Sequence, residues 1–592
     1  MKKLEKLKLQ WKGLFETMVR FPITVALLVA SSIVMFIITN QSSDEILYKT
    51  FISLMIGSLL SSVLQLAYER FIESKKIRLI FAIITILLSF TYFLILYWSE
   101  MNYQVAIRTT ILFFVLVILF LWIPSIKSKV TFNESFMAVF KAFFTTVFFA
   151  GLLYLGVAIV LLAFNELIVE INYKAYEYAA NIIFILFAPM YFLSFIPVYP
   201  RNNDPVDEKV EKATTPSKFL ENLISYVFIP ITAVFTVILL LYIVINIMGD
   251  FWKDNLLEPI LIIYSIGIIL VYLLASRIEN KFSKYFKLSI PKILIPVVLF
   301  QTLASILKIQ EVGITYGRYY VILFGIFATI AGILFCFISV KKNGIIAPIL
   351  IGLSVISILP PVDAFTISRA NQASRLKQVL IKNEMLQEGR IIPNENISTE
   401  DKDIIVSTVQ YLESSDDVNK IAWLSSYNPN DFEKTFGFSK YNRHTPVTDM
   451  YYYFTLIRGE AIPIQDYDYF MRVNLFYSPM NSDLATFTVE NRQYSLFYEV
   501  VDLDEDKNPE ENYLVLKSDD GFDLIKLAID DIFQKYEKLK DFDRSEITVE
   551  EASATWENEN VILTYVAEHM DLYRHVTEKK YSADGFFFIK IK

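Results

Sequence analysis

The feature that most constrains this chain is a series of apolar blocks, each about 20 residues long, separated by short loops rich in Lys and Arg. A helix needs about 20 mainly apolar residues to cross the roughly 30 Å of hydrocarbon in a bilayer. Blocks of this kind begin near Phe21, Ile46, Ile77, Val105, Ala142, Tyr178, Phe219, Leu256, Pro291, Tyr319 and Gly344. We therefore predict a polytopic α-helical membrane protein with about 11 transmembrane helices.

Two of these blocks need comment. The first, from Phe21 to Thr39, follows a basic segment but has no small-residue cleavage motif, so we expect it to be a retained span. The ninth is the weakest, because Lys292 and Pro296 lie in its first turns and Gln301 lies near its middle. Without the ninth block, the C-terminal part of the chain would lie on the opposite side of the membrane.

Basic residues fall almost entirely in alternate loops, and short cytoplasmic loops are the ones that retain Lys and Arg. One side carries Lys2, Lys3, Lys6, Lys8, Lys12, Arg20, Arg70, Lys75, Lys76, Arg78, Lys127, Lys129, Lys141, Arg201, Lys209, Lys212, Lys218, Arg277, Lys281, Lys284, Lys287, Lys292, Lys341 and Lys342. The other side carries Lys49, Arg108, Lys174, Lys253, Lys308 and Arg318. This asymmetry predicts eleven spans, a cytoplasmic N-terminus and an extracytoplasmic C-terminal domain.

The chain changes character after Pro360 and Pro361. Residues 1–363 are predicted to form the transmembrane domain, 364–400 a juxtamembrane amphipathic helix with a linker, and 401–592 an extracytoplasmic domain. The last region is acidic, which argues against nucleic acid as a partner, because phosphates require a basic surface.

Residues 401–592 have the pattern of a soluble α+β domain with a mainly antiparallel sheet. Ser398 and Asp401 indicate the start of a helix, and a second amphipathic helix is expected from Asp523 to Leu539. Aromatic and β-branched residues predict strands at 451–456, 470–477, 484–489, 494–501, 513–516, near 547, at 561–566 and at 586–591.

The juxtamembrane helix, from about Ala364 to Glu388, has basic residues among its apolar positions. Two interpretations are open. The basic residues could contact anionic lipid headgroups, or the helix could be a connector that packs on the soluble domain.

The residue types that carry most enzymatic and metal chemistry are scarce. The single cysteine, Cys336, excludes a disulfide within one chain, and the three histidines are His444, His569 and His575. The acidic turn from Asp502 to Glu511 lacks the order of ligands of an EF-hand. We therefore expect no catalytic, cofactor-binding or metal site, and no cofactor.

Polar side chains inside the predicted spans are few, and Asn181 and Gln301 are the main candidates. Such groups are costly in a bilayer and often mark a transport path, although hydrogen bonds between helices are the simpler explanation.

The loop before the tenth span contains Gly313, Thr315 and Arg318. Gly313 makes its backbone flexible, and Arg318 is one of the few basic residues on the outer side. It could recognise an anion or headgroup, or dock the outer domain. The alternative is an arginine that reaches the membrane surface and pairs with Glu311.

This loop resembles a bacterial multi-pass membrane family, the domain of unknown function 4153, which has a Tyr-Gly-x-Thr-x-x-Arg motif before a late span. Gly313, Thr315 and Arg318 match the motif, whereas Val312 stands at the tyrosine position. A second match follows the last span, at Pro361, Asp363, Ala364, Phe365, Ser368, Gln372, Arg375, Leu376 and Leu380. The resemblance implies a location in the bacterial plasma membrane, and it transfers no catalytic residue.

Our first functional hypothesis is a non-enzymatic envelope protein that contacts the lipid bilayer and whose outer domain senses or binds an envelope protein or cell-wall component. The alternative is a transporter or lipid-handling permease that uses the helical bundle. A third possibility, a transferase for lipid-linked substrates, would need acidic residues near span ends, such as Asp44, Glu45, Glu166 or Glu170.

Overall fold

The computed structural model divides the chain into two compact units, Met1–Lys440 and Tyr441–Lys592. It describes residues 13–41, 44–72, 74–201, 204–246, 257–425, 427–440, 449–457, 459–476, 481–489, 492–501, 511–536, 539, 546–575 and 579–592. The unit boundary lies about 40 residues beyond the predicted one, because the segment after the last span packs with the membrane unit.

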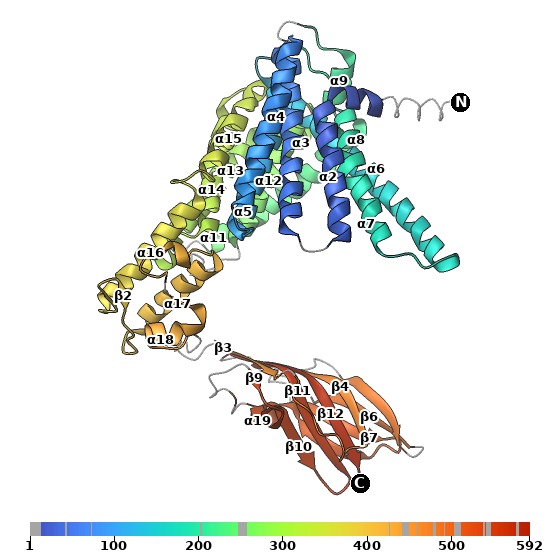
Figure 1. Cartoon of the computed structure of the whole chain (residues 1–592), viewed down its shortest axis with the longest axis vertical. Helices are drawn as coiled ribbons and strands as arrows, with labels where there is room; N and C mark the ends of the chain where they lie inside the picture. The colour runs from blue at the N-terminus through green and yellow to red at the C-terminus, as the bar shows by residue number, and fades with distance from the viewer. Residues whose placement is uncertain are drawn as a thin grey trace. The chain divides into compact units, whose positions relative to one another are not determined.

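The membrane unit is a bundle of long apolar helices, shown in blue to yellow in Figure 1. Within the described residues, 10 helices are long and apolar enough to cross a membrane. These spans are α2 (Pro22–Asn40), α3 (Glu45–Phe71), α4 (Lys75–Tyr97), α5 (Tyr103–Trp122), α6 (Phe132–Leu167), α7 with η2 and α8 (Lys174–Ser194), α9 to α11 (Glu208–Ile245), α12 (Leu257–Ala275), α13 (Lys281–Val312) and α14 (Tyr316–Phe337). The multi-pass prediction is confirmed.

The predicted eleventh span is a shorter helix than the others. A 3₁₀ turn, η5 (Val340–Ile345), leads into α15 (Ile346–Ile356). This segment nevertheless runs the length of the bundle, because the Val340 carbonyl accepts from Asn133 at the start of α6, and the Val362 carbonyl accepts from Tyr319 at the start of α14. The chain therefore passes from one end of the bundle to the other once more after α14.

The ninth span is a continuous helix of 32 residues despite its two internal prolines, Pro291 and Pro296. It packs closely on α14, where a Cβ added to Gly325 would come within 2.1 Å of the Thr302 hydroxyl. Neighbouring helices support proline-containing spans in this way, by close backbone approach at small residues.

The two ends of the bundle differ, and we call them the N side, where α2 begins, and the cap side, where α15 ends. On the N side, Arg20 donates to the carbonyl of Ile196 at 2.5 Å, and Arg201 donates to the carbonyl of Ile72 at 3.0 Å. Both carbonyls lie where a helix has just ended. The arginines therefore satisfy acceptors that no longer have a partner within a helix.

A small helical domain, which we call the cap, follows the last span and belongs to the membrane unit. It comprises α16 (Ala364–Lys382), β1 (Leu386–Gln387), β2 (Arg390–Ile391), α17 (Thr399–Ser414) and α18 (Phe432–Phe436). As predicted, the Ser398 hydroxyl caps α17 by accepting from the Asp401 backbone N–H at 3.2 Å. Leu376 and Leu380 of α16 pack with Ile405 and Val409 of α17 in a core of its own.

The second unit contains two sheets around one core, and all strand pairs are antiparallel except the short parallel pair β3–β9. The six-stranded sheet has the order β4–β12–β11–β3–β9, and β10 pairs with the first half of β11. Its strands are β3 (Asp449–Leu456), β4 (Tyr469–Phe476), β9 (Glu546–Ile547), β10 (Ser553–Glu557), β11 (Val561–His575) and β12 (Lys579–Ile591). This arrangement confirms the predicted α+β class with a mainly antiparallel sheet.

The four-stranded sheet has the order β5–β6–β7–β8, with β5 (Ser482–Val489), β6 (Arg492–Val501), β7 (Glu511–Ser518) and β8 (Asp523–Ala528). The prediction of a helix from Asp523 to Leu539 is wrong in its first part. Residues 523–528 pair with β7, and only α19 (Ile529–Tyr536) is helical there. The short apolar run in β8 fits either structure, and pairing with β7 selects the strand.

Candidate functional site

The junction between the spans and the cap brings together most of the residues that the sequence singled out. Asp363 lies at its centre, directly before α16, and its side chain is fully buried. It accepts hydrogen bonds from the backbone N–H groups of Phe365 and Thr366 at 3.1 and 3.2 Å, and from the Thr366 hydroxyl at 2.6 Å. Asp363 is therefore the N-cap of α16.

The same carboxylate forms an ion pair with Arg108 of α5 at 2.8 Å. Burial by itself raises the pKa of Asp363, but the hydrogen bonds from Thr366 and Arg108 outweigh this effect and hold the pKa below its usual value. The Arg108 guanidinium also lies 5.3 Å from the centre of the Phe365 ring. The start of the cap is thus attached to the span that begins on the same side.

Gly313 and its neighbours form the second attachment. Gln372 donates to the carbonyls of Val312 and Ile314 at 2.9 and 3.3 Å, and Asn371 accepts from the Ile314 N–H at 2.8 Å. Gly313 has φ +75° and ψ −177°, a conformation that is almost restricted to glycine. A Cβ at this position would also come within 2.6 Å of the Gln372 amide. The loop therefore needs glycine for both its backbone and its contact with α16.

Thr315 and Arg318 have different roles from each other. The Thr315 hydroxyl accepts from the Arg318 backbone N–H at 3.3 Å and caps α14. The Nη1 of Arg318 is buried and has no hydrogen-bond partner within the described residues. Within the described residues, no ion pair joins Arg318 to Glu311.

Ser368 and Arg375 complete the set of predicted residues on α16. Ser368 is buried and interacts with the hydroxyl of Tyr411 on α17, which accepts from the Tyr316 N–H at 2.9 Å. Burial raises the pKa of Tyr411, so this hydroxyl stays protonated at neutral pH. Arg375 donates to the carbonyl of Glu311, close to the end of α13. All seven predicted loop and tether residues thus lie at this junction.

A third attachment involves residues that the sequence did not reveal. Gln104 of α5 donates to the carbonyl of Ser415 at 2.6 Å and to Asp417 at 3.1 Å. Asp417 is buried and also accepts from Arg369 of α16 at 3.2 Å and Lys420 at 3.0 Å. These contacts join α5, α16 and the turn after α17. Gln104 stands one residue before the predicted start of the fourth block, and no local pattern links it to Asp417.

The basic face of α16 is largely used within the protein. Arg369 pairs with Asp417, Arg375 binds the Glu311 carbonyl, and Lys382 pairs with Asp401 at 2.8 Å. These contacts favour the interpretation of α16 as a connector helix over contact with lipid headgroups. The helix packs on the spans and on α17.

The two polar residues inside the spans differ sharply. Asn181 exchanges two hydrogen bonds of 2.9 Å with Ser32 of α2, one to its hydroxyl and one to its carbonyl. Gln301 of α13 is 1% exposed, and both polar atoms of its side chain are without a hydrogen-bond partner within the described residues. Helix pairing explains Asn181 but does not explain Gln301.

The candidate metal-binding residues do not form a cluster in the part of the chain that the structure describes. His569 shares a hydrogen bond of 3.1 Å with Thr455, and its ring stacks on Tyr453. His444 and most of the acidic turn, from Asp502 to Glu510, lie outside the described residues. The junction between the spans and the cap, by contrast, consists of helix-capping and ion-pair contacts. Such contacts hold the cap against the ends of the spans.

This architecture defines a class: a polytopic membrane protein whose last crossing leads into a helical cap, followed by a separate β-rich unit. The model of a family described as a domain of unknown function, DUF4153, matches residues 23–389, and the chain belongs to that family. The match ends in the turn between β1 and β2, so it includes the spans and α16. No curated protein and no solved structure matches the chain.

Proposed function

We propose that this protein is a non-enzymatic component of the bacterial envelope, in which the membrane bundle presents a β-rich domain that binds an envelope component or a protein partner. We place the N-terminus in the cytoplasm and the β-rich unit outside the plasma membrane. The alternation of basic loops supports this orientation, because the basic residues Arg20, Arg201 and Arg277 all lie on the N side.

The observation that carries the proposal is the exposed face of β4 in the six-stranded sheet of the second unit, which we call the open face. One face of this sheet is covered, since Val473, Leu475, Met570 and Leu572 are buried in the core. The side chains that alternate with them on β4 are exposed, and Phe470 is 63% exposed. Large apolar side chains grouped on a solvent face are typical of interaction surfaces.

Other exposed residues of β3, β4 and β11 give this surface mixed chemistry. Phe476 on the same strand is 39% exposed, and Tyr453 on β3 is 45% exposed. Arg472 and Glu568 form an exposed ion pair of 3.2 Å on the same surface. Aromatic and charged groups in this combination suit a ligand with both apolar and polar parts, such as a peptide or a glycan.

The test is co-sedimentation of the fragment 441–592 with isolated cell walls and with envelope protein extracts. The fragment has a core of its own and is expected to fold. We expect binding that is lost in the double variant Phe470→Ser and Phe476→Ser. Phe522→Ser is the matched control, because Phe522 is 60% exposed but lies in the turn between β7 and β8 of the other sheet.

Two results would contradict the proposal. One is a folded fragment that sediments with no envelope fraction. The other is binding that Phe522→Ser weakens as much as the double variant does, since the open face would then have no special role.

A further inference from the structure

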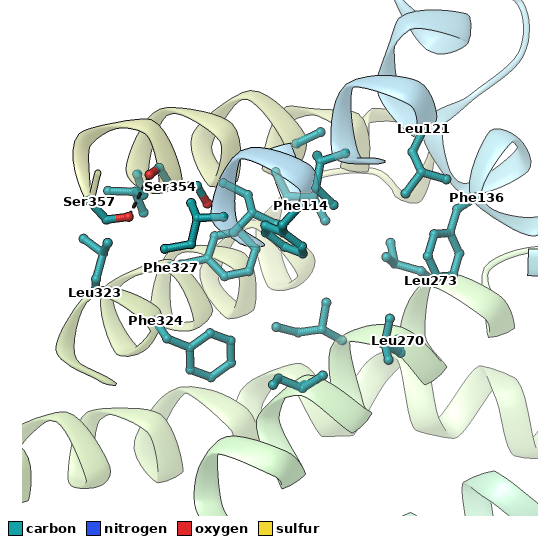
Figure 2. A pocket seen from close by; sticks show the side chains of 18 of the residues that line it. Phe114, Leu121, Phe136, Leu270, Leu273, Leu323, Phe324, Phe327, Ser354 and Ser357 are labelled. Carbon is teal, nitrogen blue, oxygen red and sulfur yellow. Dashed lines mark hydrogen bonds between the residues drawn. The ribbon is translucent and has the colours of Figure 1, made fainter. Parts of the chain in front are cut away.

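The spans line a partly open, elongated apolar cavity of about 390 Å³ between α5, α12, α14 and α15, with α6 at one end. Figure 2 shows Leu121 and Phe136 at one end and Ser354 and Ser357 at the other. Its lining on α15 runs from Ile346 to Ser357, which corresponds to about 16 Å along a helix. The cavity therefore extends along the bundle over about half of a bilayer.

Water is a poor occupant of this space. A buried water needs two to four polar partners, and the walls are built almost entirely from Ile, Leu, Phe and Ala. The Ser357 hydroxyl already donates to the carbonyl of Ser354 at 2.7 Å, as the dashed line in Figure 2 shows. An empty space would leave many side chains without van der Waals contacts. The volume falls within the usual range of ligand pockets, roughly 300–1,000 Å³.

The polar end of the cavity lies beside the junction described above. The Ser357 carbonyl accepts from the Ala364 N–H at 3.1 Å and from the Tyr320 hydroxyl at 3.4 Å. Ala364 follows Asp363, the partner of Arg108, and Ile111 lines the cavity one turn along α5 from Arg108. A cation thus lies just beyond the end that carries the hydroxyl groups.

Arg108 can meet an anion through the exposed part of its side chain. Its Nη2 pairs with Asp363, and its Nε is buried and out of reach of a ligand. The side chain as a whole is 35% exposed, so a ligand can reach the rest of the guanidinium. Arginine commonly binds phosphate.

We propose that the cavity holds one hydrocarbon chain of an anionic phospholipid from the surrounding bilayer, with the phosphate beside Arg108. The bilayer contacts this bundle on all its lipid-facing helices and supplies this molecule at high concentration. The long apolar walls accept the chain, and the hydroxyls and Arg108 accept the polar head. The inference does not rest on what the β-rich unit binds.

The test measures lipid retention by the full chain. The protein is purified in detergent, incubated with equal amounts of phosphatidylglycerol and phosphatidylcholine, washed, and examined by native mass spectrometry. We expect one retained phospholipid, predominantly phosphatidylglycerol. Leu350→Trp places an indole in the cavity and should lower the fraction of lipid-bound chains by about tenfold.

Leu152→Trp is the matched control, because Leu152 is 55% exposed on α6 and does not line the cavity. It should retain lipid as the wild type does. If Leu350→Trp does not fold, Ser354→Phe blocks the cavity from its polar end. The paired variant Arg108→Gln with Asp363→Asn leaves the net charge unchanged but removes the guanidinium donors, so it should keep a lipid and lose its preference for phosphatidylglycerol.

Three results would overturn the proposal: no retained lipid on the wild type, equal retention by the wild type and a folded cavity-blocking variant, or an unchanged headgroup preference in the paired variant. Equal loss of lipid in Leu152→Trp would also overturn it, because the retained lipid would then lie on the outer surface of the bundle.

Discussion

Arg108 and Asp363 form an ion pair of 2.8 Å across 255 residues of sequence. Arg108 lies in the second turn of the fourth span and Asp363 directly precedes the cap, so the pair fixes where the chain passes from the spans into the cap. Because Asp363 is fully buried, its charge depends on this partner and on the N–H groups of α16. The pair is therefore the first target for testing whether the cap is held rigidly.

Asp363→Ala should destabilise the membrane unit by about 3 kcal/mol, because it removes a helix cap and leaves Arg108 without its partner. Thermal unfolding of the full chain in detergent measures this change, and hydrogen exchange should report faster opening of α16. Lys377→Ala, at an exposed position of the same helix, serves as the control. Equal stability of both variants would show that the pair does not hold the cap.

The pH dependence of stability follows from the same carboxylate. The pKa of Asp363 is lowered in the folded protein, and so is that of Asp401, which pairs with Lys382. A lowered pKa adds stability that is fully present above the unfolded value of about 3.9 and is lost as the pH falls through the folded value. The stability difference between wild type and Asp363→Asn should be constant at pH 5–7 and shrink below about pH 4. A difference that grows on acidification would contradict this account.

Gly313→Ala should cost about 1–3 kcal/mol, because φ is +75° and the new Cβ would lie 2.6 Å from the Gln372 amide. Gly352→Ala is the matched control: no atom lies within 4 Å of its added Cβ, and a helical Gly→Ala change should gain about 0.5–1 kcal/mol. A double-mutant cycle with Gln372→Ala separates the two causes in the same unfolding assay, because Gln372→Ala alone already loses two hydrogen bonds. If Gly313→Ala costs nothing in the Gln372→Ala background, the cost lies in the contact alone, whereas we expect part of the cost to remain.

The sequence indicated which residues belong to the junction, but not which of them contact one another. Asp363, Gln372 and Gly313 follow from short motifs near one another in the chain, and local capping rules already explain Asp363. Gln104 and Asp417 are 313 residues apart, and no local pattern links them. Their pairing depends on how α5 packs beside the cap, which only the tertiary structure provides.

Two further differences have local physical causes. The block after Gly344 has the composition of a full span, but its first two residues, Gly344 and Ile345, end a 3₁₀ turn and the helix stops at Ile356, so α15 itself has 11 residues. The basic residues of the N-side loops indicate orientation in the sequence alone. Arg20 and Arg201 also bind carbonyls at helix ends, so their positions serve packing as well as topology.

Gly325→Ala tests the close packing of the ninth and tenth spans. The added Cβ would lie 2.1 Å from the Thr302 hydroxyl, an overlap that should cost about 1–3 kcal/mol. Thr302→Ala removes that oxygen, so the nearest remaining atom is the Cβ of residue 302 at 3.2 Å. The double variant should therefore recover most of the loss, and a double-mutant cycle in thermal unfolding gives the coupling. Additive effects would mean that the two helices are not in contact there.

The last prediction compares the two polar residues inside the spans. Asn181→Leu should cost about 1 kcal/mol, since it breaks both hydrogen bonds to Ser32. Gln301→Leu should leave the unfolding temperature unchanged or raise it, because the buried amide makes no compensating hydrogen bond within the described residues. Both variants are measured by thermal unfolding of the full chain in detergent. A loss of stability in Gln301→Leu as large as that in Asn181→Leu would show that the amide has a partner in the membrane, and the transporter alternative would then deserve a flux assay with this variant.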